Sequence, residues 1–263
     1  MEDAIKKLII LLVGILFLVA CRQVSGGDGP TSGREAVANC RTLVNGMAAL
    51  NGNMKIPQYF LTENPVKQGG EFDVMQYFEV LDHLSMQPGY ALDYVYYYDG
   101  MGGYPVLYAY PVGQQPYATE ADLEAAGEKA NYLDYVQMDD TPDGYFQFAL
   151  LAMKGNQFYL NWHANYNDKQ VVCDKTGVKD IIAGLDGGFG SRIPIASRLR
   201  ASLLGNVTPS VVVVEQTVEV RLVTFTKWGG FYLTTFAISR SSPHTFQDMG
   251  EQNLVPYECG IMF

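Results

Sequence analysis

Two strand-forming runs near the C-terminal end constrain the fold more than any other feature. Residues 217–226 and 231–240 are rich in Val, Thr and Phe, and only Lys227-Trp228-Gly229-Gly230 separates them. A connection this short, with two glycines, is typical of neighbouring antiparallel strands. We therefore expect a long antiparallel hairpin, preceded by a further strand over residues 211–214.

Two other regions also favour strands. Residues 92–98 and 104–110 repeat with period two on either side of a glycine-rich loop, which predicts a second hairpin. Residues 132–138, 145–153 and 157–163 are separated by segments rich in Asp, Asn, Gly and Pro. Because these are turn-forming residues, the three runs are expected to form a meander.

Four segments carry helical signals, mainly capping boxes and apolar residues at helical spacing. The clearest begins at Asp73, where Gln76 completes a capping box and Phe72 is placed to pack against Tyr77. A second capping box pairs Ser32 with Glu35. The predicted helices cover residues 32–51, 73–87, 119–130 and 174–185. Together these elements predict an α+β protein, mainly antiparallel sheet built of hairpins and a meander, with about four helices.

Net charge limits the class of partner. The 263 residues include 18 Lys and Arg against 28 Asp and Glu, a formal charge of −10. Nucleic-acid binding depends largely on a basic face that pairs with phosphates. We therefore expect no nucleic-acid partner.

An apolar stretch lies at the N-terminal end. Lys6-Lys7 precedes thirteen uncharged residues, 8–20. At ~1.5 Å per residue such a helix spans about 20 Å, which is short of the ~30 Å bilayer core. The length fits the apolar part of a signal peptide, and an uncleaved anchor helix is the alternative.

The motif Leu18-Val19-Ala20-Cys21 ends this stretch and resembles the lipobox of bacterial lipoproteins. The resemblance implies that the Cys21 thiol is acylated and that Cys21 becomes the N-terminus after cleavage. It also implies a membrane partner through this lipid and a location on the extracytoplasmic face of the cell envelope. The leader departs from the usual pattern because two acidic residues offset its two lysines. The rest of the chain resembles only uncharacterised bacterial lipoproteins of similar size.

The sequence suggests three parts. Residues 1–20 form the signal peptide, residues 21–33 a flexible glycine-containing tether, and residues 34–263 a single globular domain. A cluster of glycines offers an alternative division of that domain near residues 186–195.

Three cysteines remain once Cys21 is acylated. Outside the cytoplasm, one disulfide and one buried thiol are the expected outcome. We favour Cys173 with Cys259, because Cys40 belongs to the apolar stripe of the first predicted helix. The other pairings stay open.

Tyrosines are concentrated in the predicted hairpin of residues 92–110. Alternation would place Tyr94, Tyr96 and Tyr98 on one face. Such a face suits contact with a glycan or a protein, because each ring offers an apolar plane and a hydroxyl. The alternative is that the rings pack beneath a helix.

Further aromatic candidates lie later in the chain. Trp162, His163 and Tyr166 occur among several amide side chains, a mixture that suits a pocket for a polar ligand or a well-bonded loop. Trp228, at the tip of the last predicted hairpin, is either an exposed anchor or a lid over its own strand.

Signatures of catalysis and metal binding are weak. The sequence has no Cys-x-x-Cys pair, no Gly-x-Ser-x-Gly motif and no dinucleotide-binding glycine motif, so no metal or cofactor is expected. The favoured function is a membrane-anchored binding or structural module that contacts a polymer, glycan or protein. The alternative is an envelope or extracellular hydrolase that uses His163 with a nearby carboxylate.

Overall fold

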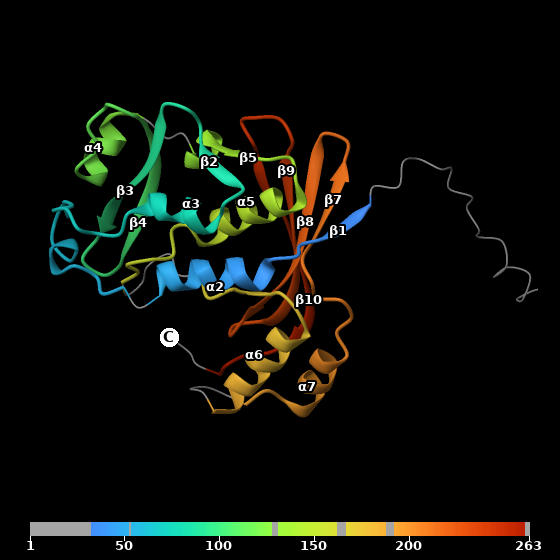
Figure 1. Cartoon of the computed structure of the whole chain (residues 1–263). Coiled ribbons are helices and arrows are strands. Elements are labelled where there is room, and N and C mark those ends of the chain that lie inside the picture. Colours follow the sequence, from blue (N-terminus) through green and yellow to red (C-terminus); the bar gives the residue numbers. More distant parts are fainter. Residues whose placement is uncertain (1–32, 53, 128–130, 162–166, 188–191, 261–263) are drawn as a thin grey trace, which may run out of the picture. The chain divides into compact units, whose positions relative to one another are not determined.

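A six-stranded antiparallel sheet organises the part of the chain that the computed structural model describes, residues 33–52, 54–127, 131–161, 167–187 and 192–260 (Figure 1). Five strands lie in the order β1-β7-β8-β9-β10, and β6 also pairs with β8. The pairs β2–β5 and β3–β4 form two smaller sheets. The strands are β1 (Arg34–Ala36), β2 (Leu84–Met86), β3 (Tyr90–Tyr98), β4 (Gly103–Pro111), β5 (Val136–Met138), β6 (Gln170–Val172), β7 (Ser210–Val214), β8 (Thr217–Thr226), β9 (Gly230–Ser239) and β10 (Phe246–Pro256).

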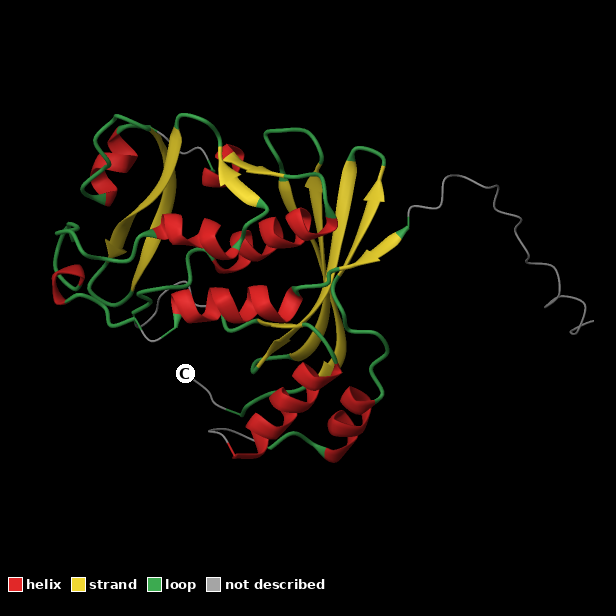
Figure 2. Cartoon of the chain, in the orientation of Figure 1, coloured by secondary structure: helices red, strands yellow, loops and turns green. Residues whose placement is uncertain are grey.

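Helices pack against this sheet and against the β3–β4 pair (Figure 2). The α-helices of the described residues are α2 (Cys40–Asn51), α3 (Tyr77–Val80), α4 (Glu120–Ala125), α5 (Pro142–Lys154), α6 (Lys175–Gly187) and α7 (Ile195–Ser202). The expected α+β class with antiparallel sheets is confirmed at this level.

Strand β8 is central and is buried on both faces. Val218, Val220 and Leu222 belong to the core that includes residues of α2 and α5. Val223 and Phe225 belong to a second core with residues of α6 and α7, as expected because successive side chains of a strand point to opposite faces.

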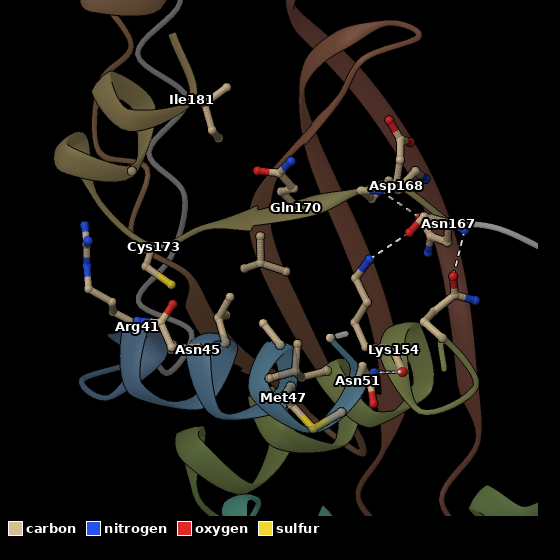
Figure 3. Close-up of a pocket in the computed structure, with 18 of the residues that line it drawn as sticks. Arg41, Asn45, Met47, Asn51, Lys154, Asn167, Asp168, Gln170, Cys173 and Ile181 are labelled. Carbon is tan, nitrogen blue, oxygen red and sulfur yellow. Dashed lines mark hydrogen bonds between the residues drawn. The ribbon is translucent and has the colours of Figure 1, made fainter. Parts of the chain in front are cut away.

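The two halves of β8 have different neighbours on one edge. β7 pairs with residues 217–221 of β8. β6 pairs with residues 223–225 of β8, where Gln170 lies opposite Phe225. This change of neighbour places the segment before α6 opposite α2, where the candidate site lies (Figure 3).

Helix α5 replaces a predicted strand. Thr141 caps the helix by accepting the Gly144 N–H at 3.1 Å, and Pro142 occupies the first turn. Side chains on every side of α5 are buried, so residues 145–153 show no polar face from which a helical period could be seen. The predicted meander is therefore wrong; of its first run only β5 is a strand, and the described part of residues 157–163 contains none.

Two predicted helices begin or end elsewhere. The segment with Glu35 forms β1, which pairs with β7, so the proposed capping box with Ser32 is wrong and α2 starts only at Cys40. Asp73 does cap a short helical segment by accepting the Met75 N–H at 2.9 Å. That segment ends with α3, and β2 follows where helix was expected.

Local signals performed better elsewhere. The hairpins β3–β4 and β8–β9 form as predicted, and Thr119 with Asp122 makes a capping box at α4. Helix α6 lies where a helix was expected. Strand β10 and helix α7 were not predicted; β10 exposes most of its side chains and so shows no alternation.

Candidate functional site

A cavity of about 600 Å³ lies between α2, the end of α5 and the segment that runs through β6 into α6 (Figure 3). Small-molecule sites typically measure ~300–1,000 Å³, so the volume suits a small ligand. Apolar side chains from all three elements line part of it: Val44, Met47, Leu150, Val171 and Ile181.

Lys154, the last residue of α5, contributes a partly buried ammonium group to the cavity wall. Burial lowers the pKa of Lys154 to about 8, although the Asp168 carboxylate opposes this shift. The ammonium donates to the Asn167 carbonyl at 2.9 Å. Asp168 is occupied elsewhere, because it accepts from the Thr226 hydroxyl at 2.7 Å and the Lys227 N–H at 2.8 Å. An ammonium has three donors, so Lys154 can also bind an acceptor in the cavity.

Hydrogen bonds hold the side-chain amides of two wall residues, Asn51 and Gln157, in place. Asn51 donates to the Lys154 carbonyl at 2.7 Å and accepts from the Tyr77 hydroxyl at 2.6 Å. The Asn167 N–H donates to the Gln157 side chain at 2.7 Å. This part of the wall is therefore preorganised.

Two further side-chain amides lie on opposite walls and remain available to hydrogen-bond a ligand. Asn45 on α2 and Gln170 on β6 are exposed and line the cavity, and neither makes a side-chain hydrogen bond within the described residues (Figure 3). Each amide offers donors and an acceptor, so together they can bind hydroxyl or amide groups of a ligand.

An ion pair and a disulfide lie beside the cavity, and Arg41 and Cys173 contribute to its lining. Arg41 donates from two nitrogens to Asp174, at 3.2 and 2.6 Å, and this contact holds the pKa of the Asp174 carboxyl below its usual range. Cys40 and Cys173 form a disulfide beside this pair. The favoured pairing of Cys173 with Cys259 is therefore wrong. Cys259 is a free, buried thiol in the core of α6 and α7, 2% exposed.

The chain matches no protein-family model, no curated protein and no solved structure. The described ranges contain no group of His, Cys, Asp or Glu side chains suited to a metal ion. In the same ranges, no helix is long and apolar enough to span a membrane.

The tyrosine face of the β3–β4 hairpin points inward. Tyr94 and Tyr96 are each 1% exposed, and Phe60 stacks on Tyr96 with ring centroids 4.4 Å apart. Tyr98 is half-buried and packs against the same core. Buried rings cannot form a contact surface, so the expected role of this face in ligand binding is wrong for Tyr94 and Tyr96.

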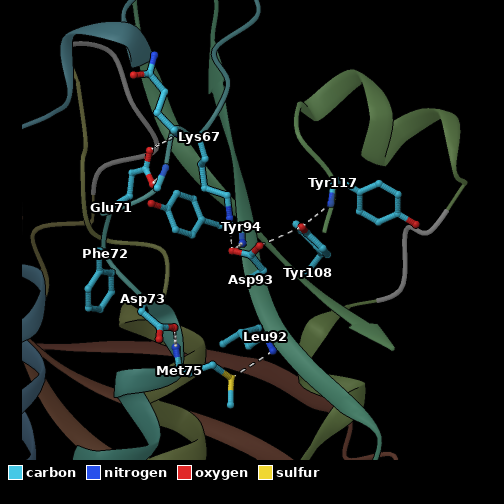
Figure 4. A network of polar contacts seen from close by, with 12 residues as sticks. Lys67, Glu71, Phe72, Asp73, Met75, Leu92, Asp93, Tyr94, Tyr108 and Tyr117 are labelled. Atoms are coloured by element: carbon cyan, nitrogen blue, oxygen red, sulfur yellow. Dashed lines mark hydrogen bonds and ion pairs between the residues drawn. The ribbon is translucent and has the colours of Figure 1, made fainter. Parts of the chain in front are cut away.

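Polar contacts tie this hairpin to neighbouring loops (Figure 4). The Lys67 ammonium pairs with Asp93 and lies 4.7 Å from the centre of the Tyr94 ring. Asp93 also accepts from the Tyr108 hydroxyl at 3.3 Å, and Tyr108 accepts the Tyr117 N–H at 2.9 Å. These tyrosines therefore stabilise the fold.

The remaining candidates have different outcomes. Trp228 is 43% exposed at the β8–β9 turn and does not line the cavity. Cys21, Trp162, His163 and Tyr166 lie outside the described residues.

Sequence reasoning missed the residues that line the cavity. Lys154 belongs to the segment Lys154-Gly155-Asn156, which separates two strands of the predicted meander and was expected to be a turn. Asn45 and Gln170 resemble any exposed amides. The apolar run before Lys154 was the available signal, since a lysine at the end of a helix with nine buried residues is placed to be partly buried itself.

Proposed function

We propose that this chain is a lipid-anchored binding protein of the extracytoplasmic face and that its cavity holds a small polar ligand such as a glycan fragment. The cavity carries this proposal. Its apolar lining suits the C–H faces of a sugar, and Asn45, Gln170 and Lys154 suit its hydroxyl or carboxylate groups.

The proposed location rests on the leader and on the lipobox that ends at Cys21. The Cys40–Cys173 disulfide supports it, because disulfides persist mainly in oxidising compartments outside the cytoplasm. Replacing Cys21 with Ala should abolish labelling by radioactive palmitate. Continued labelling of that variant would contradict the anchor.

The hydrolase alternative gains no support within the described residues, because His163 lies outside them. His83 pairs with Asp139 at 2.6 Å, and His244 contacts the Ser239 carbonyl at 2.9 Å. Neither histidine lines the cavity. Binding is therefore the function that the geometry supports best.

A glycan array followed by calorimetry on the best ligand tests the cavity. Asn45→Ala and Gln170→Ala should each weaken binding by about 3–10-fold, the effect of one lost hydrogen bond. Gln252→Ala is the matched control, because Gln252 is exposed on β10 and does not line the cavity. Equal affinities for all three variants would place the ligand elsewhere.

A further inference from the structure

Helix α7 presents an apolar stripe to solvent. Ile195 and Leu199 on the helix and its C-cap residue Leu203 are 78%, 58% and 81% exposed, and their spacing of four places them on one side. The opposite side is fixed to the fold: Ala201 is buried, and the Ser197 hydroxyl donates to a β10 carbonyl at 2.9 Å. The stripe is therefore held facing outward.

Arginines flank this stripe. At ~100° per residue, Arg198 and Arg200 lie on either side of it, and Arg192 precedes the helix. Residues 187–214 contain no Asp or Glu, although the whole chain has a formal charge of −10. Arg198 pairs with Asp186, and Arg200 and Arg192 are exposed. Apolar side chains between cations are typical of helices that lie in a membrane interface.

The start of the described chain lies beside the segment that follows α7. Arg34 lines a small cavity together with Asn206 and Thr208, and the Val37 N–H donates to the Pro209 carbonyl at 3.0 Å. Residues 22–33 connect Cys21 to Arg34. A flexible chain of that length has a root-mean-square span of about 20 Å. A lipid on Cys21 would therefore keep this part of the fold close to the membrane.

We infer that α7 docks on the membrane surface, with Ile195, Leu199 and Leu203 inserted among the lipids and the neighbouring arginines at anionic headgroups. The inference rests on the proposed anchor at Cys21, which supplies the first attachment point. Three apolar side chains bind lipid weakly alone, but the tether raises their effective concentration at the surface. Two attachment points fix the orientation of the domain on the membrane.

The test uses the acylated protein reconstituted in vesicles of phosphatidylcholine and phosphatidylglycerol. An environment-sensitive fluorophore is attached through Leu199→Cys or, as matched control, through Met249→Cys on β10. Leu199 and Met249 are 58% and 57% exposed, and the native thiols do not compete because Cys259 is buried and the other two described cysteines are bonded. On vesicles, the emission of the fluorophore at position 199 should shift to shorter wavelength and should be quenched by spin-labelled lipid. The emission of the fluorophore at position 249 should show neither effect. The shift should be smaller on phosphatidylcholine alone.

Two results would overturn the inference while leaving the anchor intact. The first is that the protein floats with the vesicles while the emission of both fluorophores stays at the wavelength found in water. The second is a short-wavelength emission at 199 without vesicles, together with a dimeric mass in sedimentation, which would assign the stripe to a second copy of the chain. Absence of both acyl mass and flotation would instead reject the anchor and, with it, the docking that depends on it.

Discussion

Cys40 and Cys173 join the first turn of α2 to the residue that follows β6, across 133 residues of chain. The same two elements form opposite walls of the cavity. The disulfide therefore limits the distance by which these walls can separate, and it links the stability of the fold to the shape of the site.

Removal of this disulfide should destabilise the protein. The double variant Cys40→Ala/Cys173→Ala should lose about 2–5 kcal/mol of unfolding free energy, because the bond closes a long loop and restricts the unfolded chain. Urea unfolding measures the loss, and addition of a reductant to the wild type should reproduce it. An unchanged midpoint under reducing conditions would contradict the predicted role.

Lys154→Met should stabilise the protein near neutral pH. The pKa of Lys154 is lowered from 10.5 to about 8 by burial, so below pH 8 the folded chain carries the full cost of the buried charge. Between about pH 8 and 10 the folded state loses this proton before the unfolded state does, and the wild type gains stability as pH rises. The variant's advantage should be up to about 3 kcal/mol near pH 7 and should shrink toward pH 10. Urea unfolding across this pH range measures the effect. If burial did not lower the pKa of Lys154, the unfolding free energies of the variant and the wild type would differ by a constant amount.

Two adjacent inward-facing tyrosines should respond differently to loss of the hydroxyl. The Tyr96 hydroxyl donates to the Tyr159 carbonyl at 2.7 Å, whereas the buried Tyr94 hydroxyl has no hydrogen-bond partner among the described residues. Tyr96→Phe should lower stability by about 1–2 kcal/mol, and Tyr94→Phe should leave it equal or higher. Both substitutions keep the ring, so equal losses in chemical denaturation would show that Tyr94 is satisfied.

The His83–Asp139 contact should make stability depend on pH. The hydrogen bond to Asp139 raises the pKa of His83 above its ordinary 6.5, so the stabilisation is fully present below pH 6.5. It is lost as pH rises through the folded-state pKa. The difference in unfolding free energy between the wild type and Asp139→Asn should therefore be larger at about pH 6 than at about pH 8. Equal differences at the two pH values would contradict a raised pKa of His83 in the folded state.

Local chemistry explains which elements could be predicted. The β8–β9 hairpin and the Thr119 cap depend on residues close in sequence, and both were predicted. Helix α5 was not, because a segment buried on all sides carries no periodic signal. The antiparallel pairing of β1 with β7 depends on contacts far along the chain.

The site was harder to predict for the same reason. Its walls come from segments that meet only in the folded chain, and the disulfide between Cys40 and Cys173 follows from that meeting. Asn45 and Gln170 acquire a role only because α2 and β6 face each other. Tyr94 shows the same limit for a residue that was expected at the surface. The alternation of its strand does not reveal that other segments cover it in the folded chain.

Strand β1 is joined to β7 by three residue pairs, and the disulfide at Cys40 follows shortly after it. A mechanical force applied through Gly33, as drag on a tethered domain would apply it, acts on these pairs first. They can separate and re-form, whereas the covalent bond at Cys40 stops the peeling before it reaches the rest of α2. The arrangement would let the N-terminal strand detach under load without opening the cavity.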